Sequence, residues 1–187
     1  MKKALVLLAE GVEEMEGVII VDVLRRAGVQ VTAAAIGDTL EVTASRGMKL
    51  VADERLENQQ PTDFDALVLP GGAGGSRRLA ADARVLELLR KFVAEKKLVA
   101  AVCAAPLALQ AAGVLVGKKF TCHPGVRDQF SGMQPETARV VEDGMLITSQ
   151  GPGTSMEFAL AIARRLVGAK IAEGVAAGLI LPAGVQW

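Results

Sequence analysis

The chain has 187 residues, of which 51% are hydrophobic and 22% charged, and its 21 basic residues balance its 21 acidic ones. The apolar share excludes a disordered protein, and the length predicts one domain over residues 1–187 with a full-sized core. The charge balance argues against a stable nucleic-acid partner. The sequence holds no unbroken apolar run of about 20 residues, so we expect no membrane partner.

Two further features predict a cytoplasmic protein. The start, MKKALVLLAEGVEE, begins like a signal peptide, but its apolar part ends at Ala9 and acidic residues follow where a cleavage site would lie. We therefore interpret it as the first strand. The two cysteines, Cys103 and Cys122, are too few for a disulfide scaffold in a chain of this size, which favours a reducing compartment.

Short apolar runs alternate with longer helical patterns along the chain. The runs predict strands at 4–9, 29–36, 65–70, 98–103 and 145–149. The patterns between them predict helices at 14–27, 76–96, 105–113 and 154–167. Nearly continuous apolar strands are typical of a parallel sheet buried on both faces. The alternation therefore predicts a doubly wound α/β fold, with a mostly parallel sheet and helices on both faces.

Two segments depart from this alternation. Residues 39–53 hold two alternating stretches around Ser45-Arg46-Gly47, which predict a small antiparallel β-hairpin at the edge of the sheet. The tail, 171–187, is apolar but too short to cross a membrane. We expect the tail either to cover the sheet or to contact another subunit, and we favour a homodimer.

Cys103 ends the fourth predicted strand, at the sheet edge where ligands bind in such folds. Small residues surround it (Ala101, Ala104 and Ala105), as a sharp turn between a strand and a helix requires, and Pro106 suits the first helical turn. A helix start would lower the thiol pKa below its usual value of about 8.5 and make Cys103 a nucleophile. The alternative is a small buried core residue.

Glu16 is the candidate acid. It shares a helical stripe with Ile20 and Val23, which predicts that it points inward, whereas Glu13 and Glu14 are explained by the helix dipole. A carboxyl that is removed from water next to a thiolate has a raised pKa and is able to carry a proton.

Backbone amides and one histidine complete the candidate site. The glycine-rich stretch 71–76 follows the third strand, and the Gly72 amide paired with that of Ala104 would form an oxyanion hole, although a plain tight turn explains the glycines as well. His123 is the only histidine and follows a strand-like stretch, 119–122.

Two other motifs have simpler interpretations. We expect no metal site, because Cys103, Cys122, His123 and Glu16 lack the ligand spacings of zinc sites. In 149–162 we expect a strand, a glycine turn and a helix, with Thr154 or Ser155 as N-cap and Glu157 completing a capping box.

With these residues in view, the chain resembles the ThiJ/PfpI superfamily, in the branch of bacterial YajL and the Parkinsonism-associated deglycase. The stretches that carry the resemblance follow one another over nearly the whole chain: LAEGVEEMEGVIIVDVLRRAGVQVT, ASRGMKL, DALVLPGG, VAAVCAAP, TCHP and TSQGPGTSMEFALAI.

This resemblance implies a flavodoxin-like homodimer that needs no cofactor. Cys103 matches the family's nucleophile, Glu16 a protonated glutamate, His123 a nearby histidine, and Gly72 and Ala104 the amides of the site. Proteins of this branch are similar to glutathione-independent glyoxalases that act on methylglyoxal and glyoxal, and are described as deglycases of glycated proteins and nucleotides.

Two departures from the family limit what the resemblance implies. Ala104 stands where the protease-like branch has a histidine, which argues against peptidase activity. Ala44 stands in the region where the human protein has a further cysteine, so a redox role of that thiol does not carry over.

The sequence supports two hypotheses from different classes. The first is a glyoxalase or deglycase, in which the Cys103 thiolate adds to an aldehyde and Glu16, with or without His123, moves a proton through an enediol. The second is a redox sensor or stress chaperone whose Cys103 is oxidised. Flavin or nucleotide binding is poorly supported, because the chain has no Tyr, one Trp and no phosphate-binding motif.

Overall fold

A parallel sheet forms the centre of the computed structural model, which describes residues 1–182 and 184. Within these residues the main sheet has seven strands in the order β5-β2-β1-β6-β7-β9-β8. The strands are β1 (Lys3–Leu8), β2 (Gln30–Ala35), β5 (Glu54–Arg55), β6 (Ala66–Leu69), β7 (Leu98–Val102), β8 (Val140–Asp143) and β9 (Leu146–Ser149). Among the described strands of this sheet, only β8 and β9 pair in antiparallel fashion. The five central strands follow the order of flavodoxin-like folds, which confirms the predicted fold class.

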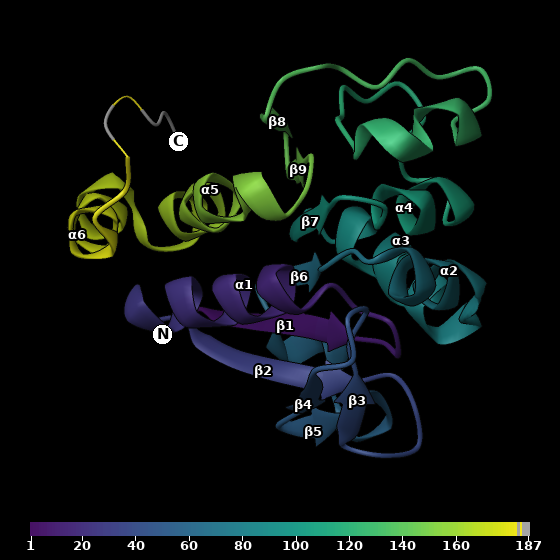
Figure 1. Ribbon diagram of the computed structural model, residues 1–187, viewed down its shortest axis with the longest axis horizontal. Helices are drawn as coiled ribbons and strands as arrows, with labels where there is room; N and C mark the ends of the chain where they lie inside the picture. Colours follow the sequence, from purple (N-terminus) through teal and green to yellow (C-terminus); the bar gives the residue numbers. More distant parts are fainter. Residues whose placement is uncertain (183, 185–187) are drawn as a thin grey trace.

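Helices cover both faces of the sheet (Figure 1). The helices are α1 (Glu14–Arg26), α2 (Ala73–Ala81), α3 (Ala83–Ala94), α4 (Pro106–Ala111), α5 (Ser155–Val167) and α6 (Ala169–Leu179). Successive residues of β1 point to opposite faces, so that Val6 packs with residues of α1 and α5, whereas Leu7 packs with residues of α3 and α4. This double burial explains why the strands read as continuous apolar runs.

The single helix predicted over 76–96 is two helices, α2 and α3. Asp82 adopts an extended backbone between them, and its carboxylate accepts a hydrogen bond from the Arg84 amide at 2.9 Å. An aspartate in this position caps a new helix more readily than it continues an old one. The apolar pattern spans both helices because both bury their inner face against the same side of the sheet.

The hairpin and the chain end differ in detail from the prediction. Strands β3 (Glu41–Thr43) and β4 (Lys49–Val51) pair around the expected turn, but they form a sheet of their own, while β5 forms the edge of the main sheet beside β2. Helix α6 packs on α5 rather than on the strands, so the expectation that the tail covers the sheet is wrong as far as Pro182. A contact of the tail with another subunit stays a prediction, and residues 183 and 185–187 lie outside the described part.

Helix length bears on the membrane question. None of the helices in the described ranges, 1–182 and 184, is both long and apolar enough to cross a bilayer.

Candidate functional site

Cys103 lies at the turn between β7 and α4, as the small residues around it predict. Its backbone has a φ of 63°, in the left-handed region that non-glycine residues seldom occupy. Such a conformation costs about 1–3 kcal/mol and persists only where its surroundings enforce it. The Cys103 amide donates to the carbonyl of Ser149 at 3.0 Å, and the Cys103 carbonyl accepts from the His123 amide at 2.8 Å. Ala101, Ala104 and Ala105 are buried around the turn, where larger side chains would not fit.

Glu16 projects from the first turn of α1 to the same point, fully buried, as the stripe with Ile20 predicts. Its Oε2 accepts a hydrogen bond from the Gly71 amide at 2.7 Å. Its Oε1 is buried and has no hydrogen-bond partner among the described residues. Burial raises the pKa of Glu16 to about 7, with a smaller contribution from Glu13, while the Gly71 amide and the Cys103 thiol oppose the shift. Glu16 is therefore able to gain and lose a proton near neutral pH.

Gly71 allows these two groups to meet, and the sequence analysis did not single it out. A Cβ at position 71 would lie 2.5 Å from the Cβ of Cys103 and 2.7 Å from Glu16 Oε2. Real side chains never approach so closely, so only glycine fits between the thiol and the carboxyl. The signal for this position is the run of four glycines after β6, although the sequence does not say which of them contacts the nucleophile.

The predicted lowering of the thiol pKa is wrong for the site as it stands. Burial raises the pKa of Cys103 to about 12, and the charge of Glu16 adds to this effect. The amides of Gly72 and Ala104 donate to the sulfur and lower the pKa, but by less. The α4 helix has only six residues, so its dipole is weak. When Glu16 holds a proton its charge is absent, so the thiolate is accessible only in the form of the pair in which Glu16 is protonated.

His123 is tied to Cys103 through the backbone, and its ring is held by the turn that follows it. The Gly125 amide donates to His123 Nδ1 at 3.0 Å, which leaves the proton of the neutral ring on Nε2. A Cβ at Gly151 would lie 3.4 Å from His123 Cδ2, so the ring rests over the loop after β9. The strand expected at 119–122 is absent, and Thr121 forms only an isolated bridge with Glu136.

Cys122 is separate from this site. It is buried in the apolar cluster on the α3 and α4 face, whereas Cys103 packs against the cluster on the α1 and α5 face. Burial raises the pKa of the Cys122 thiol to about 11. The described residues include no group of three acidic, histidine or cysteine side chains placed to hold a metal ion. A cavity of about 570 Å³ opens beside the loop after β2, lined by Glu10, Asp38 and Arg78 among others, but Cys103 is not part of it.

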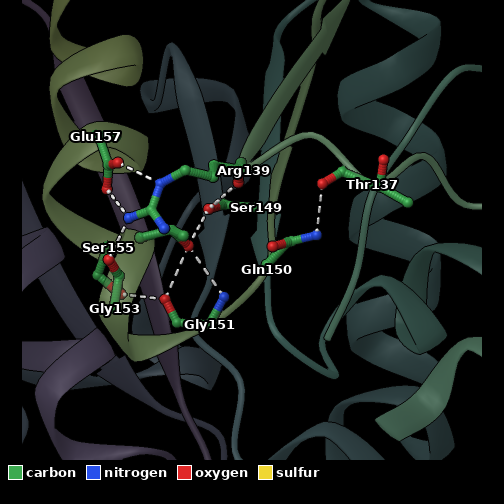
Figure 2. A network of polar contacts seen from close by, with 9 residues as sticks. Thr137, Arg139, Ser149, Gln150, Gly151, Gly153, Ser155 and Glu157 are labelled. Carbon is green, nitrogen blue, oxygen red and sulfur yellow. Dashed lines mark hydrogen bonds and ion pairs between the residues drawn. The ribbon is translucent and has the colours of Figure 1, made fainter. Parts of the chain in front are cut away.

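The loop between β9 and α5 also differs from its prediction. Thr154 is the N-cap residue, but its side chain makes no cap bond to the helix, and Glu157 forms no capping box. Glu157 instead pairs with Arg139, with 2.6 Å between the Arg139 Nε and the Glu157 Oε1 atoms (Figure 2). The sequence analysis missed Arg139 because no short-range pattern links it to a residue of the following helix.

Comparison with known proteins identifies relatives of this chain. The DJ-1/PfpI family model matches residues 2–165. The chain is 45% identical over 184 residues to the Parkinson disease protein 7 homolog of Danio rerio, covering 96% of this chain and 97% of that protein. It is 39% identical over 170 residues to the glutathione-independent glyoxalase DJR-1.2 of Caenorhabditis elegans, covering 89% and 90% of the two proteins.

Solved structures extend the likeness to the fold. The crystal structure of Drosophila melanogaster DJ-1beta superposes with a TM-score of 0.92 at 44% identity, covering 97% of this chain and 98% of that one. A family match over most of the chain, close relatives of the same length and a shared fold lead to one conclusion. The chain belongs to the DJ-1/PfpI family.

Proposed function

We propose that this protein is a cysteine-dependent glyoxalase that converts methylglyoxal to lactate, and glyoxal to glycolate, without glutathione. The observation that carries the proposal is the buried Glu16 carboxyl, with a pKa raised to about 7, beside the thiol of Cys103. A nucleophile and a proton carrier that titrates near neutral pH are the two groups that this isomerisation needs. The glyoxalase name of the Caenorhabditis elegans relative adds support.

The first step forms a hemithioacetal. The Cys103 sulfur bonds to the aldehyde carbon of methylglyoxal, the C=O π bond breaks, and the proton shared by Cys103 and Glu16 passes to the new oxygen. The amides of Gly72 and Ala104, which donate to the sulfur, lie beside the carbon that bonds to it. They therefore supply hydrogen bonds to the developing oxyanion.

The second step moves a proton between adjacent carbons. The ionised Glu16 carboxylate removes the proton from the carbon bonded to sulfur, and the proton of the adjacent hydroxyl passes to the neighbouring oxygen through the enediol. Glu16 then returns its proton to the neighbouring carbon, and a C=O bond forms at the carbon bonded to sulfur. The product is a lactoyl thioester of Cys103, and one water hydrolyses it to lactate and the free thiol. His123, with its proton on Nε2, donates a hydrogen bond to a substrate oxygen in this scheme.

Lactate formation tests the proposal. We expect Cys103→Ser and Glu16→Gln to lower kcat by at least about 1,000-fold, since each removes a group that reacts directly. Cys122→Ser is the matched control and should stay within about threefold of the wild type, because Cys122 lies outside the site. If the wild type produced lactate no faster than Cys103→Ser, the proposed enzyme activity would be refuted.

The deglycase variant uses the same thiol. In this variant Cys103 attacks the carbon of an aminocarbinol formed between the dicarbonyl and an amine of a protein or nucleotide, and the amine leaves. Release of free amine from an aminocarbinol model adduct by the wild type, but not by Cys103→Ser, would support it. Release at equal rates with both proteins would mean that free dicarbonyl alone is the substrate.

The second candidate function is a redox sensor or stress chaperone. Glu16 Oε1 is buried and no described residue bonds to it, so its protonated form is able to donate a hydrogen bond to an oxygen added to the Cys103 sulfur. Intact mass after mild peroxide tests this function. A mass gain at Cys103 that Glu16→Gln suppresses would support it, and an unchanged mass at Cys103 would exclude it.

The proposal also includes a homodimer in a reducing, cytoplasmic compartment. Large apolar side chains are exposed on α1 (Met15 and Val18) and on the hairpin (Met48 and Val51). Exposed apolar groups that lie on neighbouring elements are typical of subunit interfaces. Light scattering of the purified chain checks this part, and a monomer at micromolar concentration would contradict it.

A further inference from the structure

The left-handed backbone of Cys103 depends on a partner that is distant in the sequence. The Cys103 amide donates to the carbonyl of Ser149 at 3.0 Å, at the point where β9 ends. The residues that follow Ser149 contact the site a second time, because Gly151 lies under the ring of His123. The position of residues 149–151, named here the support loop, therefore bears on both Cys103 and His123.

A chain of hydroxyl groups holds the support loop. The Ser149 hydroxyl donates to the Arg139 carbonyl at 2.8 Å, and the hydroxyls of Ser149 and Thr154 lie 2.6 Å apart. The Gly151 amide donates to Thr154 Oγ1 at 3.0 Å, and Ser155 Oγ donates to the Gly151 carbonyl at 3.1 Å. Thr154 Oγ1 also lies 2.9 Å from the Gly151 carbonyl, so its one proton has two acceptors within reach, that carbonyl and the Ser149 hydroxyl, and both belong to the support loop.

The Arg139 guanidinium links the start of α5 to the segment that follows the support loop. Figure 2 shows it between Glu157 on α5 and the support loop. Its Nη2 donates to the Gly153 carbonyl at 2.6 Å and to Glu157 Oε2 at 3.1 Å, while its Nε donates to Glu157 Oε1 at 2.6 Å. The fork fixes the angle as well as the distance between the two side chains.

Glu157 makes this fork more than a surface ion pair. Its side chain is only 5% exposed, against 60% for Arg139, so the carboxylate depends on the arginine for the hydrogen bonds that water would otherwise supply. The backbone near Arg139 also bonds to the support loop. The backbone amide of Gln150 donates to the Arg139 carbonyl at 3.3 Å, and the side-chain Nε2 of Gln150 donates to the Thr137 carbonyl at 2.9 Å. The ion pair and the backbone hydrogen bonds of Arg139 therefore both fix the position of the support loop.

We propose that Arg139 and Glu157 are positioning residues that hold the support loop so that Ser149 keeps Cys103 in its reactive, left-handed conformation. Neither residue reacts with substrate. The pair locks Gly153 and the start of α5, the hydroxyl chain transmits this position to Ser149, and the Ser149 carbonyl orients the Cys103 amide. For catalysis the inference rests on the proposed glyoxalase, but for the reactivity of the thiol it stands alone.

The experiment compares Arg139→Gln and Glu157→Gln with the wild type in two assays. One gives kcat and KM for methylglyoxal, and the other gives the rate of Cys103 alkylation by iodoacetamide between pH 6 and 9, with Cys122 distinguished by peptide mass. We expect kcat to fall at least tenfold with KM changed less than threefold, and the alkylation profile of Cys103 to change in parallel. The double variant should be no slower than either single one, because both disrupt the same pair.

Arg84→Gln is the matched control. Arg84 also forms a fork with a carboxylate, Asp82, and donates to a backbone carbonyl, that of Ile36 at 2.7 Å, and its side chain is 52% exposed. It lies at the start of α3, on the other face of the sheet. We expect Arg84→Gln to leave kcat and Cys103 alkylation within twofold of the wild type even where it lowers the melting temperature.

Cys103 alkylation at the wild-type rate over the whole pH range in folded Arg139→Gln and Glu157→Gln would overturn the inference. Arg139→Lys serves where these variants do not fold, because it keeps the charge and loses the fork, and an unchanged alkylation profile there has the same meaning. The two proposals fail separately. If the wild type makes no lactate, the proposed glyoxalase function is refuted, but the alkylation assay still tests the role of Arg139 and Glu157.

Discussion

Glu16 and Glu157 occupy equivalent places in two neighbouring helices and have opposite surroundings. Each is the third residue of its helix, α1 or α5, and each is almost completely buried. Glu157 receives two hydrogen bonds from the Arg139 guanidinium, whereas Glu16 receives one from a backbone amide and, within residues 1–182 and 184, none from a cation. One carboxyl forms an ion pair, and the other has a pKa raised to about 7.

The difference shows that burial alone does not decide the role of a carboxyl. A buried carboxylate with a forked arginine keeps its charge and serves as a structural anchor. A buried carboxyl without a cation has a raised pKa, so it can carry a proton near neutral pH, but its ionised form lowers the stability of the folded protein. The two glutamates are indistinguishable by helix position, so the partner supplied by another segment makes the distinction.

The largest effect should come from adding one methyl group beside Glu16. We expect Gly71→Ala to destabilise the protein by about 3 kcal/mol, because the new Cβ would overlap Cys103, Glu16 and the carbonyl of Val102. We also expect at least a 100-fold loss of lactate formation, since displacements of about 1 Å at reacting groups have effects of this size. Urea denaturation and the lactate assay measure both.

Gly74→Ala is the control from the same glycine run. A Cβ there would lie 3.4 Å from its nearest neighbours, and the residue is helical, so the variant should be as stable as the wild type or up to about 1 kcal/mol more stable. Equal behaviour of the two variants would mean that the close approach at Gly71 does not hold the pair in place.

The next effect is a gain of stability in Glu16→Gln. The folded pKa of Glu16 is raised from 4.5 to about 7, so between these pH values the folded state binds more protons than the unfolded state and the stability of the wild type falls as pH rises. Above pH 7 the loss is complete, and it amounts to about 3 kcal/mol. Glu16→Gln removes this loss and should be more stable than the wild type at pH 8.

Urea midpoints at pH 5 and pH 8 measure this prediction. The advantage of Glu16→Gln should shrink strongly at pH 5, where the wild-type carboxyl is mostly protonated in the folded state. An advantage of the same size at both pH values would point to a packing effect of the amide, and no advantage at pH 8 would show that Glu16 does not have a raised pKa.

The smallest effect should have the opposite sign and concern Glu157. We expect Glu157→Gln to lower stability by about 1 kcal/mol at pH 7, because the exposure of Arg139 lets water replace part of the lost ion pair. Urea denaturation next to Glu16→Gln gives the direct comparison. If Glu157→Gln stabilises the protein as Glu16→Gln does, the contrast between the two glutamates is wrong.

Much of the fold follows from local patterns in the sequence. The apolar runs of β1, β2, β6, β7 and β9 are legible because each of these strands is buried on both faces, and α1 and α5 are legible from their stripes. The break between α2 and α3 at Asp82 was not predicted from the sequence. The apolar pattern continues across Asp82, and only the capping preference of this one residue indicates that a new helix begins. The sequence analysis also missed β5, because two residues carry no periodicity, and β8, because its two acidic residues and partial exposure leave no apolar run.

Some features of the candidate site were likewise predictable from the sequence, and others were not. The sequence by itself determined that Cys103 ends a strand amid small residues and that Glu16 faces inward, because strand ends and helical stripes depend on neighbours a few residues apart. Only the tertiary structure decided that Gly71 lies between the Cys103 thiol and the carboxyl of Glu16, which comes 55 residues before Gly71 in the chain. It also decided that burial raises the pKa of both groups and that Arg139 pairs with Glu157. Desolvation and ion pairing depend on which segments pack together in space, and no short stretch of sequence contains that information.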